Sequence, residues 1–570
     1  MKNTVTGLCV VLALAFAAVF ACGTGSDRGY VPTAVGRPAS VAPPSTAVHA
    51  ESAPAEMMYE PASEADEAVV ALAAPAAPPA GLAAGLAADA AFNREQYHAI
   101  EEADFRSARE QPLSTFSVDV DTASYSNVRR FLTQGQRPPV DAVRVEELIN
   151  YFSYERPQAA SDGPIALDAE VARSPFDPRR ALVRIGVRAS AASNDEPPAK
   201  RFVFLIDVSG SMSDENKLPL LKRTLGLLVP QLTSSDRVGI VVYAGASGVV
   251  LEPTRGHNHD EIMNAIESLQ PGGSTNGAAG IELAYQLAHQ SCRRGDNCRV
   301  LLATDGDFNV GLTDEGSLTR LIQRERDAGI FLTVLGFGMG NLQDGTMELL
   351  ADKGDGSYAY IDTLAEARKV LVEQASATLR TVAKDTKIQV ELNPARVARY
   401  RLIGYENRRL NDEDFNDDRK DAGDMGDGHT VTALYELELR EGGAQGSGID
   451  PLKYQGSRSA TPAASSDEWL TVKVRYKTPG AGGESKLISR VLRGAPAAFA
   501  EASTDLRFAS AVAGFGMLLR ESPHASQLGY ADVTRIARGA LGADRDGYRR
   551  EFLELVASAQ RTAPDSRYAQ

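Results

Sequence analysis

The middle of the chain combines two hydrophobic patterns. Between residues 201 and 380, short unbroken apolar runs such as 202–206 and 300–303 alternate with stretches whose apolar positions recur every three or four residues. An unbroken run is typical of a strand buried on both faces, and the longer spacing is typical of a helix with one buried face. Strands that alternate with helices predict a doubly wound, mostly parallel α/β sheet.

Outside this region the hydrophobic period changes to two, which is typical of strands with one buried face. The segments with this pattern are 388–392, 399–405, 431–439, 470–477 and 487–491, and two further strands joined by a turn are predicted at 166–172 and 181–187. We expect them to form one flanking β-sandwich into which the α/β domain is inserted. Helical spacing then returns at 504–520, 530–540 and 548–559, and it predicts an α-helical C-terminal part.

The N-terminus has the pattern of an export signal. An apolar run over residues 8–21 follows Lys2 and is too short to span a bilayer. Residues 19–23 look like a lipoprotein cleavage box, which implies a signal peptide at 1–21 and a lipidated Cys22. We therefore expect a protein anchored by lipid in the bacterial envelope, at the outer membrane or the periplasmic face. The alternative is an ordinary signal peptide with a chance cysteine.

Composition supplies the other domain boundaries. Residues 22–91 are rich in Ala and Pro and have no sustained period, which predicts a disordered tether. The remainder is long enough for two or three domains. The expected parts are a small N-terminal module (92–160), strands that join the sandwich (161–198), the α/β domain (199–381), the sandwich part of a C-terminal module (382–495) and a helical part (496–570).

The charge balance excludes some partners. The chain has 75 acidic and 60 basic residues, for a net charge of −15. Nucleic-acid binding depends on Lys and Arg that neutralise phosphates, so we expect no nucleic-acid partner. Two cysteines, Cys292 and Cys298, lie in the expected α/β domain. A pair in an exported domain indicates a disulfide, and two free thiols are the alternative.

Oxygen donors follow the apolar runs. Asp207, Ser209 and Ser211 come directly after the run 202–206. The polar loop 272–277 precedes a predicted helix, and an acidic turn at 304–307 ends the second run. Ligands of α/β sheets bind at the carboxyl ends of strands. Carboxylate and hydroxyl oxygens suit Mg²⁺, whereas Zn²⁺ prefers His or Cys, so the sequence predicts a magnesium-type site there.

At these positions the chain resembles the von Willebrand factor type A domain and its metal-ion-dependent adhesion site. The resemblance assigns Asp207, Ser209 and Ser211 to its first motif, Thr275 to its threonine and Asp305 to its last aspartate. It implies a Mg²⁺ or Mn²⁺ ion with an open coordination position that a carboxylate of a protein partner fills. The domain would then bind and not catalyse, with no small-molecule substrate.

Further segments resemble bacterial YfbK-type lipoproteins that carry a type A domain. They are residues 115–131, 146–154 and 413–434, so the likeness extends over nearly all of the chain after the tether. The family's biochemical role is poorly defined, and the resemblance therefore indicates architecture more than partner.

Two alternatives to a metal-dependent binder stay open. In the first, the metal stabilises an envelope scaffold and the flanking domains bind the partner, because a bound metal adequately stabilises a fold. In the second, Ser209 or Ser211 is the nucleophile of a hydrolase and needs a base such as His257 or His259. Separately, the acidic residues of 411–427 form either a second cation site or, as we expect, a solvated loop.

Overall fold

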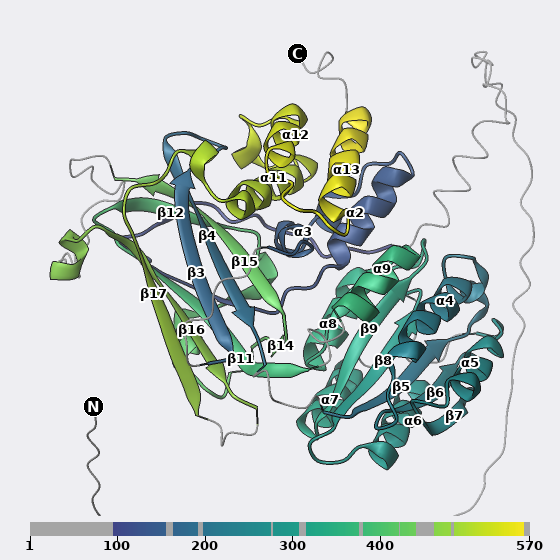
Figure 1. The fold of residues 1–570 in the computed structure, drawn as a ribbon. Helices are drawn as coiled ribbons and strands as arrows, with labels where there is room; N and C mark the ends of the chain where they lie inside the picture. Colours follow the sequence, from purple (N-terminus) through teal and green to yellow (C-terminus); the bar gives the residue numbers. More distant parts are fainter. Residues whose placement is uncertain are drawn as a thin grey trace, which may run out of the picture. The chain divides into compact units, whose positions relative to one another are not determined.

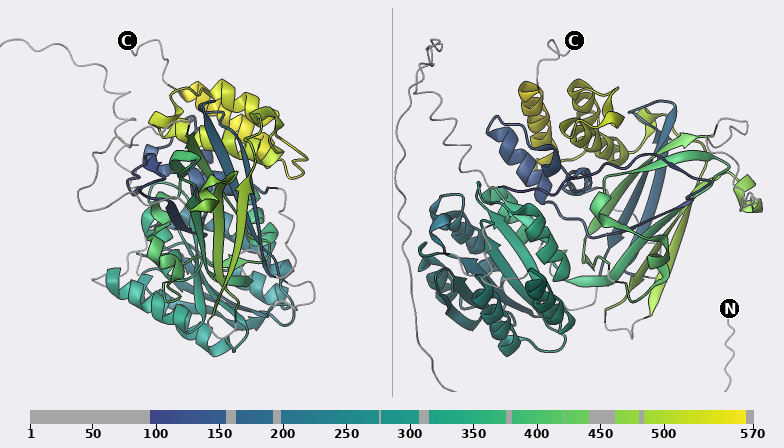
Figure 2. Two further views of the ribbon diagram at one scale, coloured as in Figure 1. Left: turned by 90° about the vertical axis from the view of Figure 1, so that its left-hand side faces the viewer. Right: turned by 180° about the vertical axis from the view of Figure 1, so that it is seen from behind.

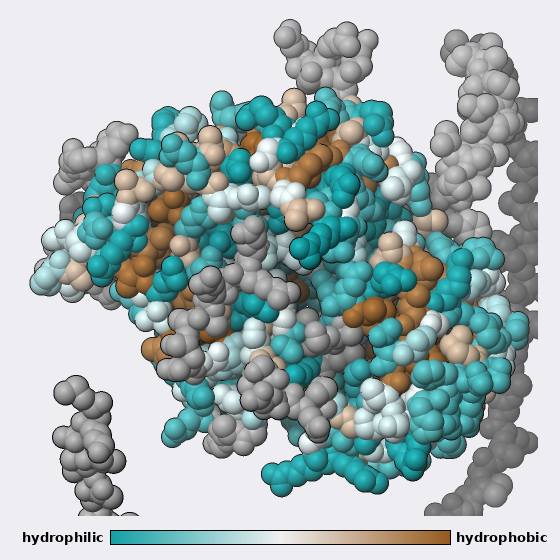
Figure 3. Space-filling model, viewed as in Figure 1, coloured by the Kyte–Doolittle hydropathy of each residue, from teal (hydrophilic) through white to brown (hydrophobic). Residues whose placement is uncertain are grey.

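The computed structural model describes residues 95–154, 163–191, 198–274, 277–306, 315–374, 380–420, 422–440, 461–479 and 484–563 (Figure 1). The expected signal peptide, the tether and Cys22 lie outside these residues, and so does Thr275. Within the described residues, no helix is both long and apolar enough to cross a membrane. The face shown in Figure 3 is mainly hydrophilic, with smaller apolar areas between the polar side chains.

The α/β domain contains a six-stranded sheet in the order β10-β9-β8-β5-β6-β7. All neighbouring strands are parallel except β7, which is antiparallel to β6. The strands are β5 (Lys200–Asp207), β6 (Arg237–Tyr243), β7 (Ser247–Arg255), β8 (Asn297–Thr304), β9 (Ile330–Phe337) and β10 (Tyr358–Ile361). The predicted doubly wound sheet is thereby confirmed.

Helices cover both faces of this sheet (Figures 1 and 2). They are α4 (Leu218–Leu228), α5 (His259–Glu267), α6 (Gly277–Ser291), α7 (Glu315–Asp327), α8 (Asp344–Lys353) and α9 (Leu364–Arg368). Strand β5 shows why its sequence is an unbroken apolar run. Phe202 and Phe204 share a core with α4, α5 and α9, whereas Val203 and Leu205 share a second core with α6, α7 and α8. Both faces of the strand are therefore buried, which explains the unbroken apolar run.

Two antiparallel sheets form the flanking sandwich that the sequence predicted. One sheet has the order β1-β12-β15-β4-β3 and the other β13-β2-β11-β16-β17, with β14 beside β11. Their strands are β1 (Arg106–Ser107), β2 (Leu113–Ser117), β3 (Ile165–Arg173), β4 (Arg180–Ala189), β11 (Thr381–Leu392), β12 (Val397–Ile403), β13 (Arg409–Leu410), β14 (Met425–Gly426), β15 (Thr430–Leu439), β16 (Glu468–Lys477) and β17 (Ser485–Arg493).

The register of β4 and β15 shows how the two domains are connected. These strands pair antiparallel from Arg188 with Thr430 to Arg180 with Glu438. Strand β4 precedes the α/β domain in the sequence and β15 follows it. The α/β domain is therefore inserted between strands of one sheet, and side chains of both sheets share one apolar core.

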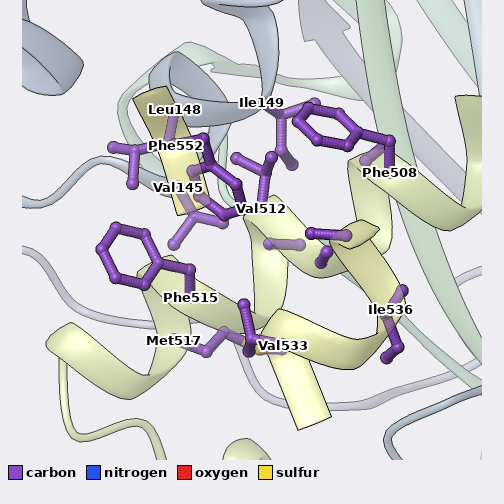
Figure 4. Packing of buried hydrophobic residues seen from close by; sticks show 14 of the residues in the cluster. Val145, Leu148, Ile149, Phe508, Val512, Phe515, Met517, Val533, Ile536 and Phe552 are labelled. Carbon is purple, nitrogen blue, oxygen red and sulfur yellow. The ribbon is translucent and has the colours of Figure 1, made fainter. Parts of the chain in front are cut away.

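The other α-helices among the described residues pack into one cluster (Figure 4). They are α2 (Ala123–Thr133), α3 (Val145–Asn150), α11 (Thr504–Leu519), α12 (Tyr530–Arg538) and α13 (Tyr548–Thr562). Phe515 of α11 contacts Phe552 of α13 edge to face, with ring centroids 5.3 Å apart. Residues 92–160, expected as a small N-terminal module, are instead divided, because β2 lies in the sandwich and α2 and α3 lie in this helical cluster.

The acidic segment 411–427 packs on the sandwich. It begins with a capping box between Asn411 and Asp414 at a short 3₁₀ helix, Asp412–Asn416. The Lys387 ammonium donates to the Asp414 carbonyl oxygen at 2.9 Å and to that of Asp417 at 2.6 Å. Among the described residues, no group of three or more acidic, His or Cys side chains is arranged to hold a metal.

Arginines from outside the α/β domain bind carboxylates on its helix α8. Arg144 lies 2.6 Å from Asp344 and 3.0 Å from Glu348, and Arg408 lies 2.7 Å from both Glu348 and Asp352. The two arginine side chains are only 4% and 6% exposed. Such buried ion pairs place strict geometric requirements on both partners, because an unpaired charge there is costly.

A second buried cluster joins α2 to α9. The Arg129 Nε donates to Asp362 at 2.8 Å, and its Nη2 donates to Glu366 at 2.8 Å. Glu366 also accepts from the Tyr151 hydroxyl at 2.8 Å. All of these ionic groups are less than a tenth exposed, so this cluster also fixes the α/β domain against the N-terminal helices.

Replacing Arg129 tests whether this contact stabilises the protein. Arg129→Met leaves two buried carboxylates without their cation, and we expect the free energy of unfolding to fall by about 3–5 kcal/mol. Arg179→Met removes an arginine whose side chain is 84% exposed and should change that free energy by less than about 0.5 kcal/mol. Urea denaturation measures both, and equal effects of the two substitutions would contradict the assignment.

Candidate metal site

Two buried carboxylates lie at one edge of the α/β sheet. Strands β5 and β8 are parallel neighbours, and Ile206 pairs with Ala303. Asp207 ends β5, and Asp305 comes directly after β8, so the register brings both residues to the carboxyl edge. Both are fully buried. The Thr304 hydroxyl donates to Asp207 Oδ2 at 3.4 Å and connects the two strand ends.

The turn after β5 presents its serines beside Asp207. The Ser209 backbone N–H donates to Asp207 Oδ1 at 2.8 Å, which holds the turn at the strand end. A short 3₁₀ helix, Gly210–Ser213, then places the Ser211 hydroxyl oxygen 3.0 Å from that of Ser209. Two hydroxyls and one carboxylate therefore gather within five residues.

The predicted threonine loop reaches the same turn. The Gly272 N–H donates to the Val208 carbonyl at 2.7 Å, and the Gly210 N–H donates to the Gly273 carbonyl at 3.1 Å. Thr275 itself lies outside the described residues. The structure thus brings together Asp207, Ser209, Ser211 and Asp305, and it anchors the loop that leads into Thr275.

The turn after β8 needs a glycine beside Asp305. Gly306 has a φ of +111°, a backbone angle that residues with a side chain rarely adopt. A Cβ added there would lie 2.2 Å from the Asn341 carbonyl oxygen. The turn therefore lies directly against the loop after β9. This close approach explains the Asp-Gly pair in the sequence.

The site concentrates negative charge. Burial raises the pKa of Asp207 to about 6, and the nearby Asp305 carboxylate contributes to that rise, although hydrogen bonds from Ser209 oppose it. A site of this kind favours a cation, which stabilises the charged form of both carboxylates.

Lys217 is a residue of this site that the sequence analysis missed. Its Nζ donates to Asp305 Oδ2 at 2.9 Å and to the Ser211 carbonyl oxygen at 3.0 Å. The side chain is only 5% exposed. A basic residue between the serine turn and the first helix was the available signal, but a lysine is usually a surface residue.

The donor set fits a hard divalent ion. Asp305 Oδ1 is buried and has no hydrogen-bond partner among the described residues, so one carboxylate oxygen is available for a ligand. The other donors are the Ser209 and Ser211 hydroxyls and the Asp207 carboxylate. These oxygens suit Mg²⁺ or Mn²⁺, and a Zn²⁺ ion would require nitrogen or sulfur ligands.

The described contacts do not supply a base for a serine nucleophile. The two serine hydroxyls pair with each other, and no histidine ring hydrogen-bonds to either of them in the described part of the chain. His259 begins helix α5, beyond the edge strand β7. A serine hydrolase would require such a base within hydrogen-bond distance.

A disulfide closes the connection between α6 and β8. Cys292 and Cys298 are bonded, with their Cα atoms 5.8 Å apart. Helix α6 starts just after the threonine loop, and β8 ends just before Asp305. The bridge therefore ties together two elements that position the site.

Comparisons with known families match almost all of the described chain. Residues 202–374 match the von Willebrand factor type A domain, and residues 377–562 match the C-terminal region of the uncharacterized protein YfbK. Residues 91–184 match a family described as von Willebrand factor.

Individual proteins are also similar to this chain. The uncharacterized protein YfbK of Escherichia coli is 43% identical over 468 residues, which are 81% of this chain and 80% of that protein. The magnesium-chelatase 60 kDa subunit of Rhodobacter capsulatus is 29% identical over 139 residues, 24% of each chain. A solved von Willebrand factor type A structure from Catenulispora acidiphila is 16% identical, with a TM-score of 0.39, and the match covers 70% of this chain and 90% of that one.

Metal binding can be tested by thermal unfolding. Mg²⁺ at a hundred times its dissociation constant should raise the free energy of unfolding by about 2.7 kcal/mol, and Asp207→Ala should abolish this shift. Glu215→Ala is the matched control, because its carboxylate lies in the same loop and is 90% exposed. An unchanged melting temperature of the wild-type protein in millimolar Mg²⁺ or Mn²⁺ would count against the site.

Proposed function

This chain belongs to the YfbK family of proteins with a von Willebrand factor type A domain, and we propose that it is a non-catalytic, metal-dependent protein-binding module. The metal would be Mg²⁺ or Mn²⁺. Its partner would be a protein that supplies an acidic side chain, in an adhesion or an assembly role.

The observation that supports the proposal most strongly is Asp305 Oδ1, which is buried and has no partner among the described residues, near a turn that carries two serine hydroxyls. Ser209, Ser211 and Thr275 would hold the ion together with the carboxylates of Asp207 and Asp305. When bound, Mg²⁺ would supply the charge and the coordination capacity that attract one oxygen of a partner's carboxylate.

The residues of this chain would have separate roles in that binding. Asp207 fixes the serine turn through the Ser209 N–H, so the hydroxyls are positioned before any ligand arrives. Ser211 is only partly buried, which leaves the site open on the solvent side. Among the described residues no histidine ring hydrogen-bonds to either serine hydroxyl, and the oxygen donors around them suit a bound cation, which supports binding over catalysis.

Capture of a partner tests this function. The protein should retain a partner from an envelope extract in Mg²⁺ and lose it in EDTA. Thr275→Ala should weaken capture about 10- to 100-fold with the fold intact, because it removes a hydroxyl from the ion's surroundings. Ser274→Ala, which removes the neighbouring exposed hydroxyl, should have no effect.

One result would favour the scaffold alternative. If the partner stays bound in EDTA and with Asp207→Ala, the metal serves stability and the flanking domains make the contact. Circular dichroism of both threonine-loop variants distinguishes lost binding from lost folding.

We also propose that the protein is exported and anchored by a lipid on Cys22, at the outer membrane or the periplasmic face. The Cys292–Cys298 disulfide supports export, since disulfides persist in oxidising compartments. Labelled palmitate should enter the wild-type protein and not Cys22→Ser. Equal labelling of the two proteins would contradict the anchor.

A further inference from the structure

Lys217 is a buried cation in direct contact with a carboxylate of the candidate metal site. Its ammonium lies 2.9 Å from Asp305 Oδ2 and 3.7 Å from the exposed Asp214. Lysine is almost never fully buried unless it is paired. The pairing uses only one oxygen of Asp305, and the other oxygen, Oδ1, is left without a partner among the described residues.

The fold holds this lysine in place. The Lys217 backbone N–H donates to the Asp214 carbonyl at 2.9 Å, and its own carbonyl accepts from the Leu221 N–H at 2.8 Å at the start of α4. Gly338, just after β9, lies against the side-chain stem, and a Cβ there would come within 2.3 Å of Lys217 Cε. The absence of a side chain at Gly338 therefore makes room for the lysine.

The formal charges of the site determine what the lysine does. Asp207 and Asp305 contribute two negative charges, and Lys217 contributes one positive charge. Without a metal the site therefore has one excess negative charge. A divalent ion converts this to one excess positive charge, which a single carboxylate from outside would neutralise.

We propose that Lys217 is an internal counter-ion that weakens the binding of metal alone and couples metal binding to the capture of a carboxylate. This inference rests on the proposed function and specifies how that same site is regulated. Without metal, the ammonium keeps Asp305 paired, which avoids an isolated buried charge. With metal, it repels the ion through a medium of low dielectric constant until an anion joins the site.

The coupling works in both directions. If a bound carboxylate tightens metal binding by some factor, bound metal tightens carboxylate binding by the same factor. Without a partner, the site would therefore bind the metal with low affinity. The acidic partner and the ion would bind together.

Calorimetric titration of the full chain with Mg²⁺, in chloride and in acetate at equal ionic strength, tests this proposal. Acetate serves as the probe for the partner's carboxylate. Lys217→Met removes the charge and keeps the length of the side chain, and Lys217→Gln is a second variant that retains a hydrogen-bond donor. Lys222→Met is the control, because Lys222 lies on the same helix α4 and its ammonium donates to the Glu267 carbonyl oxygen.

In chloride, both Lys217 variants should bind Mg²⁺ at least about tenfold more tightly than the wild type, since a like charge at short range is removed. Lys222→Met should match the wild type. Acetate should tighten Mg²⁺ binding to the wild type several-fold more than to the Lys217 variants.

Two results would overturn the inference, and they differ in what else they contradict. Equal or weaker Mg²⁺ binding by folded Lys217 variants would show that the ammonium only orients Asp305. A wild-type protein that binds no Mg²⁺ in either buffer would contradict the metal-dependent function as well.

Discussion

The parallel pairing of β5 with β8 places two buried carboxylates close together at the carboxyl edge of the sheet. The candidate site depends on this proximity. Asp207 and Asp305 are both fully buried, and burial raises the pKa of Asp207. The protein supplies one cation, Lys217, which contacts only one of them. Among the described residues Asp305 Oδ1 has no hydrogen-bond partner, so the site retains negative charge and an oxygen that would suit the divalent ion we propose.

The rest of the chain holds the domain that carries this site. The α/β domain is inserted between strands of the sandwich, so its two ends are connected to the same frame. Arg408 from the sandwich binds carboxylates of α8, and Arg129 from α2 binds carboxylates of α9. Covalent connection and buried ion pairs together restrict independent rotation of the domain. A partner held at the metal edge would therefore be held relative to the whole described chain.

The sequence predicted those features that depend on local pattern. The runs 202–206 and 300–303 identified β5 and β8 because helices cover both faces of these strands, and Asp207 and the two serines followed directly. The segments 166–172 and 181–187 were predicted as strands, and they are β3 and β4. Their membership of one β-sandwich with the strands after residue 383 was a hypothesis, which the pairing of β4 with β15 supports.

Features that depend on distant partners were not predictable in this way. Strand β2 pairs with β11 and β13, and nothing local in its sequence identifies strands almost 300 residues away. For the same reason the division of the N-terminal module between the sandwich and the helical cluster was not predicted. Lys217 and Asp305 are separated by 88 positions, and the position of a lysine after a serine turn does not by itself show that its ammonium contacts the turn after β8. Arg129 and Asp362 are 233 positions apart and present the same difficulty.

The most direct test of this account is the anomalous scattering of Mn²⁺ in crystals of the protein. We expect one manganese peak between the Ser209 and Ser211 hydroxyls, with Thr275 and a carboxylate oxygen of Asp305 facing it. This expectation would be contradicted by crystals that bind Mn²⁺ elsewhere or not at all while Thr275 lies far from the serine turn.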